Sequence, residues 1–333
     1  LKIYIWKGIK MLIEDQHPHN KSIMVATLGA PNVGKSSMIN YLLGTDLTVV
    51  THKPQTTRNH IHCVMTVDHT EIVLVDTPGL HKSNQEFNKR LNQQALDGAE
   101  GVDLNLLLVD ITRPVLEQVS DFKENFNRPL GRTWLIFTKG DVVQDAEKLP
   151  LDEITLKAKE IIPAIEKHFL ISSRSELNMN TLIGALCDEA QSGPHLYGGA
   201  VSNKNERFFA TEYIREQTFT LLKDEIPYEV AVLIEEFRDM HDQRIKEKRI
   251  ASKISASIIV NRPSQRAIVI GSGGQMIKEI GVRSRERIEQ MMGNQVHLNL
   301  HVKVAPKWFK NNMILEQLGL PRAEASARVW RQK

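Results

Sequence analysis

Cysteine is scarce in this chain of 333 residues, which contains only Cys63 and Cys187. The two lie far apart and form no Cys-x-x-Cys pair, which is typical of free thiols in a reducing cytosol and not of a disulfide framework. No His-Glu-x-x-His motif accompanies the four histidines between residues 52 and 69. We therefore interpret these histidines as structural or surface residues and not as metal ligands.

A strong net charge and a long apolar run are also missing. The formal net charge is only +3, so the whole chain is not a polybasic coat. Residues 1–13 are apolar and basic, but they are too few to span a membrane and lack the small-residue cleavage site of a secretory signal. We interpret residues 1–20 as an N-terminal extension that is disordered or results from an upstream start, with a membrane-surface helix as the alternative.

The most specific motif present is a phosphate-binding loop. Eight consecutive residues form the pattern G-x-x-x-x-G-K-S/T, namely Gly29, Ala30, Pro31, Asn32, Val33, Gly34, Lys35 and Ser36. Ser37 follows this pattern. A β-branched apolar run at 23–28 precedes the loop and a helical pattern at 37–43 follows it, which is the context that the motif requires. Backbone N–H groups and the helix dipole favour a phosphate there. We expect Lys35 to reach the β- and γ-phosphates and the Ser36 hydroxyl to ligate Mg²⁺.

A second motif follows the apolar run at 71–75 and reads Asp76, Thr77, Pro78 and Gly79. An Asp at the end of a buried strand, after a phosphate loop, is the expected second Mg²⁺ position. Gly79 can donate its N–H to a γ-phosphate and serve as a hinge. The alternative is a simple Pro-Gly turn.

The Lys-Pro-Gln-Thr-Thr-Arg segment at 53–58 is predicted to act as a switch. Thr57, with Thr56 as the alternative, would ligate Mg²⁺ in the presence of the γ-phosphate and release it after hydrolysis. Leu80 stands where Ras-like enzymes place a water-orienting Gln, so the chemistry needs another aid. Asn32 resembles the Asn that holds K⁺ in many prokaryotic-type GTPases, and such a cation would neutralise developing charge. A plain loop residue is the alternative for Asn32. Together with the phosphate-loop lysine, Thr57 and Asn32 are the candidate catalytic residues.

The nucleotide base is predicted to be guanine. Thr138, Lys139 and Asp141 resemble the N-K-x-D motif of GTPases. Asp141 can accept hydrogen bonds from guanine N1–H and N2–H₂, which adenine cannot supply, and the stem of Lys139 can cover the base. Thr138 offers fewer hydrogen-bonding groups than the motif's Asn, so we expect weaker affinity with specificity kept. Ser172 and Ser173 match the last GTPase motif, whose backbone would contact guanine O6; a strand end is the alternative.

The order of apolar runs predicts two domains. The first, at 21–190, alternates strands and helices and implies a doubly wound, mostly parallel sheet. Its other predicted strands lie at 71–75, 103–109, 133–137 and 168–171. Residues 191–202 are rich in Gly, Ser and Pro and predict a linker. Residues 203–333 form the second domain.

The second domain has a different order of elements. We expect a helix near 205–222, strands at 230–238, 251–260 and 296–304, and a closing helix at 307–318. Gly271, Ser272, Gly273 and Gly274 lie between two helical stretches and have the pattern of the clamp loop of a KH domain, where RNA backbone lies against helix N-termini. The resulting α-β-β-α-α-β order is that of the prokaryotic (type II) KH fold. A simple glycine turn between two helices is the alternative.

Basic residues recur along this domain. They are Arg244, Lys246, Lys248, Arg249, Lys253, Lys278, Arg283, Arg285 and Arg287. Basic side chains near the clamp would neutralise RNA phosphates, and we expect Lys278 and Arg283 to do so. The alternative for each is a solvated surface residue.

In combination, these motifs resemble the Era family of GTPases from about Lys21 onward. The resemblance implies an α/β P-loop GTPase domain followed by an α+β type II KH domain, with GTP or GDP, Mg²⁺ and K⁺ as cofactors. It implies slow GTP hydrolysis, binding to the 3′ end of 16S ribosomal RNA and a role in maturation of the small ribosomal subunit. The implied protein is a cytoplasmic monomer, with the inner membrane surface as a further partner. Two departures are Thr138 and Ser272, the latter replacing a Lys that contacts phosphate.

Two other functions stay open from the sequence alone. An RNA chaperone in which nucleotide mainly stabilises the fold is favoured by Leu80 and Thr138, which weaken the case for fast turnover. A regulatory switch that acts on protein partners is disfavoured by the KH-like tail.

Overall fold

The computed structural model describes residues 16–51, 53, 56–80, 85–143, 149–223, 225–239 and 250–322. Along the chain, it divides into two compact units, one ending at Asn203 and the other beginning at Lys204. Most of the predicted N-terminal extension and the basic residues at 244–249 lie outside the described residues. No helix in the described part of the chain combines the length and apolar character needed to cross a membrane.

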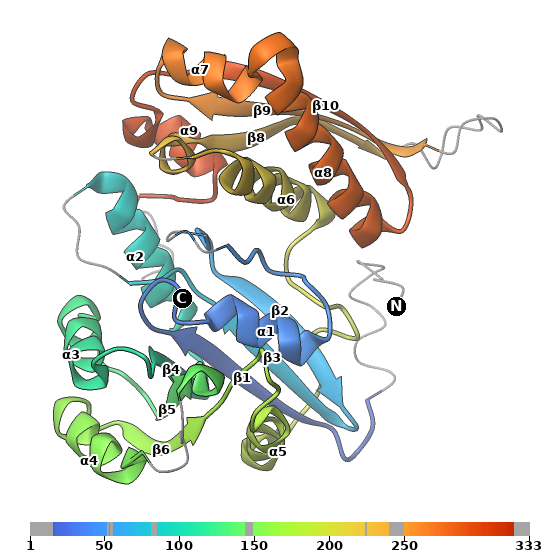
Figure 1. Cartoon of the computed structure of the whole chain (residues 1–333). Helices are drawn as coiled ribbons and strands as arrows, with labels where there is room; N and C mark the ends of the chain where they lie inside the picture. Colours follow the sequence, from blue (N-terminus) through green and yellow to red (C-terminus); the bar gives the residue numbers. More distant parts are fainter. Residues whose placement is uncertain are drawn as a thin grey trace. The chain divides into compact units, whose positions relative to one another are not determined.

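A mixed sheet forms the centre of the first unit (Figure 1). Its described strands are β1 (Lys21–Leu28), β2 (Ile61–Val67), β3 (Thr70–Asp76), β4 (Leu104–Asp110), β5 (Thr133–Thr138), β6 (Ile165–Leu170) and β7 (Gln191–Ser192). The order is β2-β3-β1-β4-β5-β6, and β7 pairs with β1. Neighbours run parallel except β2 with β3 and β7 with β1. The apolar strands β3, β4 and β5 are buried along their whole length, as expected for a sheet covered on both faces. The predicted doubly wound, mostly parallel sheet is confirmed.

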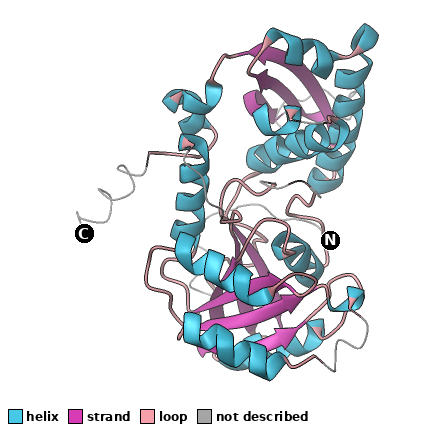
Figure 2. Ribbon diagram, turned by 60° about the vertical axis from the view of Figure 1, so that its left-hand side comes forward, coloured by secondary structure: helices cyan, strands magenta, loops and turns pink. Residues whose placement is uncertain are grey.

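Helices cover both faces of this sheet (Figures 1 and 2). They are α1 (Lys35–Leu43), α2 (Glu86–Gly98), α3 (Val115–Asn125), α4 (Leu151–Ile161) and α5 (Met179–Glu189). On one face, α2 and α3 share an apolar core with β4 and β5 that includes Leu96, Phe122, Leu107 and Phe137. Helices α1 and α5 pack against β1, β2 and β3. Because β1 lies between β3 and β4, the loops after these strands converge at one edge of the sheet, where ligands bind in such folds.

The segment predicted as a linker, 191–202, is fixed to the first unit. The carboxylate of Glu71, buried in β3, accepts hydrogen bonds from the N–H groups of Leu196 (2.6 Å) and Tyr197 (3.1 Å). The Tyr197 hydroxyl lies 2.5 Å from Nδ1 of His62 in β2, a strand that we did not predict. Gly and Pro supply the bends, but partners in β2 and β3 hold the backbone, and composition alone does not reveal them.

The second unit is a three-stranded sheet with helices packed against it (Figure 1). Its described elements are α6 (Glu206–Leu221), β8 (Ala231–Asp239), β9 (Ile250–Val260), α7 (Pro263–Ile270), α8 (Gln275–Met292), β10 (Gln295–Val304) and α9 (Asn312–Gln317). The strand order is β10-β9-β8, with β9 parallel to β10 and antiparallel to β8. The predicted α-β-β-α-α-β order is confirmed.

The closing helix predicted at 307–318 is shorter than expected. A 3₁₀ turn at Trp308–Lys310 comes first, and α9 begins only after Asn311. The Asn311 side chain accepts hydrogen bonds from the N–H groups of Met313 (3.0 Å) and Ile314 (3.4 Å). Asn is a preferred N-cap residue, so the helix restarts at this position.

Candidate nucleotide- and RNA-binding sites

The phosphate loop joins β1 to α1, and its lysine is folded back onto the loop. Gly34, with a φ of 102°, precedes the first helical residue. The buried Lys35 Nζ donates hydrogen bonds to the carbonyl groups of Gly29 (3.1 Å) and Ala30 (2.9 Å). Burial lowers the pKa of Lys35 to about 8, although the nearby Asp76 acts in the opposite direction. An anion at the start of α1 would therefore stabilise an ammonium group that is poorly solvated.

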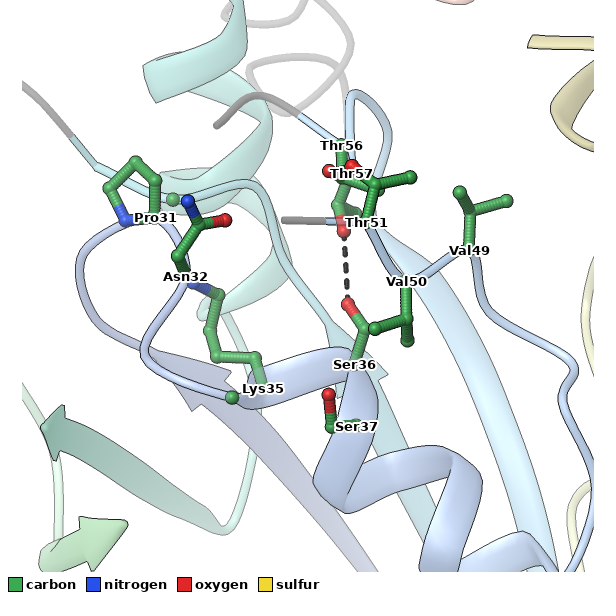
Figure 3. Close-up of a pocket in the computed structure, with 12 residues that line it drawn as sticks. Pro31, Asn32, Lys35, Ser36, Ser37, Val49, Val50, Thr51, Thr56 and Thr57 are labelled. Atoms are coloured by element: carbon green, nitrogen blue, oxygen red, sulfur yellow. Dashed lines mark hydrogen bonds between the residues drawn. The ribbon is translucent and has the colours of Figure 1, made fainter. Parts of the chain in front are cut away.

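Three side-chain oxygens from distant parts of the sequence meet beside the start of α1. Ser36 Oγ donates a 2.8 Å hydrogen bond to Oδ2 of Asp76, and Thr57 Oγ1 lies 3.3 Å from the same oxygen. The two hydroxyl oxygens are 3.1 Å apart (Figure 3). Mg²⁺ prefers hard oxygen ligands in octahedral geometry, in which neighbouring ligands lie about 2.9 Å from one another. The residues present therefore fit this ion.

The structure distinguishes the two switch threonines. Thr56 Oγ1 lies 2.7 Å from Thr51 Oγ1 and donates to the carbonyl oxygen of Lys53 at 2.7 Å, so it closes the switch loop on itself. Thr57 alone of the pair reaches the Ser36 hydroxyl. Figure 3 shows these threonines across the pocket from the phosphate-loop residues.

The loop after β3 lies directly on the phosphate loop. A Cβ atom at Gly79 would come within 2.6 Å of the backbone nitrogen of Pro31, so only glycine permits this approach. The Leu80 N–H donates a 3.3 Å hydrogen bond to the carbonyl oxygen of Gly29. The Leu80 side chain itself is buried in the apolar core. Other predicted residues of the two loops, all buried or half-buried, are Ala30, Val33, Ser37, Thr77 and Pro78.

The predicted guanine-reading carboxylate is held in place by the last GTPase motif. Asp141 Oδ1 accepts a 2.6 Å hydrogen bond from the buried Ser172 hydroxyl. The Ser172 oxygen accepts in turn from the N–H groups of Arg174 and Ser175, each at 3.2 Å. Ser173 is half-buried in the same turn. The sequence alone did not predict that one motif would orient the other.

Asp110, the last residue of β4, is a further site residue that no sequence motif marked. Its buried carboxylate lies 2.5 Å from the ammonium group of Lys139. The available signal was a repeated pattern, because β3 and β4 are both apolar strands that end in Asp.

The Gly-x-x-Gly loop turns the chain from α7 into α8 and is open on its outer side. Gly273 and Gly274 have φ values of 57° and 79°, and a Cβ atom at either would meet nothing within 4 Å. Ser272 is exposed beside them. Gly271 is enclosed, since its Cβ atom would lie 2.7 Å from that of Met276.

The basic residues of α8 fall into two groups. Lys278 is exposed in the first turn, next to the loop. Arg283 is half-exposed further along the helix and pairs with Glu279 at 2.7 Å. Arg287 instead pairs with Glu216 of α6 at 3.4 Å, so it contributes to packing between α6 and α8.

The fold and these sites define a P-loop GTPase domain followed by a KH domain. Residues 24–139 match a family model described as a 50S ribosome-binding GTPase, and residues 225–309 match a KH domain model. GTPase Era of Lacticaseibacillus paracasei is 36% identical over 89% of this chain and 95% of its own length. GTPase Era of Carboxydothermus hydrogenoformans is 34% identical over 91% and 99%. The chain belongs to the Era family of GTPases.

Two solved structures are similar along most of the chain. Era in complex with MgGDPNP and nucleotides 1506–1542 of 16S ribosomal RNA has a TM-score of 0.81, with 29% identity over 91% of this chain and 100% of that one. A variant of Aquifex aeolicus Era in which alanine replaces a tyrosine, bound to GDP·AlF₄⁻, has a TM-score of 0.80, with the same identity and coverage.

Proposed function

We propose that this chain binds and hydrolyses GTP in its first unit, binds the 3′ region of 16S ribosomal RNA with its second, and assists maturation of the small ribosomal subunit. The observation that carries the proposal is the convergence of Ser36, Thr57 and Asp76 beside a phosphate loop. The family's activity and the related complex with MgGDPNP and 16S nucleotides support it.

In this proposal, Lys35 binds the β- and γ-phosphate oxygens. Ser36, Thr57 and Asp76 hold Mg²⁺, which when bound neutralises charge on the phosphates. Gly79, already in contact with the phosphate loop, donates its N–H to the γ-phosphate. Loss of the γ-phosphate would release Thr57 from Mg²⁺. The segment around Thr57 would therefore act as a switch.

The base is read at the ends of β5 and β6. Asp141 accepts hydrogen bonds from guanine N1–H and N2–H₂, and the backbone at Ser173 contacts guanine O6. Support comes from Ser172, which holds the Asp141 carboxylate in one orientation. The stem of Lys139 covers the base.

Hydrolysis needs a substitute for a water-orienting glutamine. The buried side chain of Leu80 cannot serve. We propose that K⁺, held by the amide oxygen of Asn32, aids hydrolysis in another way. Asn32 is exposed, has a φ of 62° and lines the same pocket as Lys35 and Thr57 (Figure 3). A monovalent cation there would offset the negative charge that develops in the transition state.

RNA backbone would lie against the open side of the Gly271–Gly274 loop. Lys278 and Arg283 would neutralise its phosphates. Ser272 contributes no charge, so this clamp depends on the loop's shape and on α8.

We further propose that the chain acts as a cytoplasmic monomer, with the inner membrane surface as a secondary partner. Sedimentation of the full chain tests whether it is a monomer. Flotation with anionic lipid vesicles tests binding to the membrane surface, and a protein that stays at the bottom of the gradient would contradict it.

The test of the main proposal is titration of a labelled RNA with the 3′ sequence of 16S ribosomal RNA, in the presence of GDP and of GDPNP. GTP hydrolysis is measured in parallel. Binding of this RNA in preference to a shuffled sequence, with an affinity that depends on the nucleotide, is expected. Equal affinity for both RNAs, or no GTP hydrolysis, would contradict the proposal.

A further inference from the structure

Asp110 is fixed in the protein by both backbone groups. It is the last residue of β4, and its N–H donates a 2.9 Å hydrogen bond to Oε1 of Gln118 in α3. Its carbonyl oxygen accepts a 2.8 Å hydrogen bond from Nε2 of the same side chain. One amide side chain thus satisfies both backbone groups where the sheet ends.

The Asp110 carboxylate is equally well defined. Oδ1 accepts hydrogen bonds from the Thr112 N–H (3.0 Å) and hydroxyl (2.6 Å), while Oδ2 lies 2.5 Å from Lys139 Nζ. Arg113 approaches Oδ2 at 3.4 Å from an exposed position. Burial pushes the pKa of Asp110 upward, but the hydrogen bonds from Lys139 and Thr112 outweigh it and keep this pKa below its usual value. The group is therefore a carboxylate at neutral pH.

Lys139 receives more from this contact than Asp110 does. The Asp110 carboxylate already has partners in Thr112 and Arg113. Lys139 is one-third exposed, and its long side chain would otherwise move among many rotamers. Its backbone is in the left-handed region, with a φ of 61°, directly after β5, whose last residue pairs with Asp110 in the sheet. The ion pair therefore holds the methylene groups of Lys139 in one conformation between the ends of two neighbouring strands.

We propose that Asp110 is a positioning residue for guanine recognition. By pairing with the Lys139 ammonium group, it keeps the lysine methylene groups in place as an apolar wall for the base that Asp141 reads. The inference rests on the proposed binding of guanine nucleotides. It predicts a loss of nucleotide affinity that depends on Lys139, without an effect on the phosphate loop.

The test is a double-mutant cycle on GDP affinity in the full chain. Asp110→Asn keeps the shape of the side chain but can direct an amide N–H₂ at the lysine, and GDP affinity should fall about tenfold. Lys139→Met should weaken binding at least as much. The double variant should be no weaker than Lys139→Met alone, because Asp110 acts through the lysine. Losses that simply add in the double variant would overturn the inference.

A control variant, a kinetic measurement and a second test variant make the result specific. Asp103, just before the other end of β4, accepts a 2.8 Å hydrogen bond from the Met24 N–H, so Asp103→Asn is a matched change that should leave GDP affinity unaltered. For Asp110→Asn, KM for GTP should rise while kcat at saturation stays unchanged. If Asp110→Asn unfolds the protein, Thr112→Val at an exposed position should loosen the carboxylate and weaken GDP binding in the same direction.

Two results distinguish a failure of the proposed nucleotide binding from a failure of the role of Asp110. A wild-type protein that does not bind GDP would contradict the proposed function itself. A wild-type protein that binds GDP, with folded Asp110→Asn and Thr112→Val variants of equal affinity, would overturn only the role of Asp110.

Discussion

The hydroxyl group of Thr138 lies 3.1 Å from the carbonyl oxygen of Val109 and 2.7 Å from that of Val33, 105 residues earlier in the chain. Its single proton is donated to the nearer oxygen, that of Val33. This contact ties the guanine-reading motif to the phosphate loop. A hydroxyl has a single proton to donate, whereas the Asn of the N-K-x-D pattern has two amide protons and an acceptor oxygen. Thr138 therefore keeps the tether to the loop but has no further donor to offer.

Changes at Thr138 should move nucleotide affinity in both directions. Thr138→Val preserves the shape but leaves the buried Val33 carbonyl without this donor, and GDP binding should weaken by about 1–2 kcal/mol. Thr138→Asn restores the missing groups and should tighten binding. Calorimetric titration with GDP measures both, and an unchanged affinity in the Val variant would show that the tether has no role.

The cation dependence of hydrolysis tests the role of Asn32. Hydrolysis should be faster in K⁺ than in Na⁺ at matched ionic strength, and Asn32→Ala should remove the difference. Because Asn32 has a positive φ, Ala also introduces backbone strain there. Asn32→Gly loses the amide without that strain and should behave like Ala, whereas Asn32→Asp retains an oxygen and should keep the preference. A wild-type rate that ignores the cation would make Asn32 a plain loop residue.

The open glycines of the clamp provide a test of RNA binding. Replacing Gly273 and Gly274 by Asp places side chains and negative charge where phosphate should lie, and RNA affinity should fall by about 2 kcal/mol. Hydrolysis of GTP without RNA should stay nearly unchanged. Gly293, at the far end of α8, also has a positive φ and open space around it, so Gly293→Asp is the matched control. Equal RNA affinity in the clamp variant and this control would count against RNA binding at this loop.

Ser272 offers the converse change. Ser272→Lys adds a cation at an exposed position of the loop. RNA affinity should rise, and the salt dependence should steepen by about one phosphate contact. Filter binding at several salt concentrations measures the slope. If neither quantity changes, the RNA path runs elsewhere.

The pKa of Lys35, which burial lowers to about 8, predicts a pH dependence of nucleotide binding. Phosphate oxygens favour the charged ammonium group, so the bound state has the higher pKa. Above pH 8, binding must take up a proton, and GDP affinity should fall by up to about tenfold per pH unit; well below pH 8 it should be constant. Fluorescence titration with GDP in EDTA measures this, and Lys35→Met should lack the decline. A GDP affinity that increases as the pH is raised through 8 would contradict this prediction.

The parts of the site that the sequence predicted are local in the chain. The phosphate loop, Asp76 and Asp141 each lie at or shortly after the end of an apolar strand, and parallel strands bring such residues to one edge of the sheet. The KH-like order was predictable for the same reason, since each element carries its own periodicity.

The parts that escaped prediction depend on contacts between distant residues. Thr56 and Thr57 are neighbours in the same motif, and only the folded loop decides that Thr56 bonds to Thr51. The docking of residues 191–202 depends on Glu71, a buried carboxylate that no local pattern marks. Asp110 ends β4 and Lys139 comes directly after the neighbouring strand β5, 29 residues later, so their pairing follows from the register of the sheet.

The most direct test of the central claim compares guanine with other bases by calorimetry. Asp141 accepts from the two donors that guanine presents, so the wild-type protein should bind GTP and GDP far better than ATP and ADP. Asp141→Asn should lose this preference and should gain affinity for xanthosine diphosphate, whose O2 can accept from the new amide N–H. Equal wild-type affinity for ATP and GTP would contradict the assignment of this chain's nucleotide site.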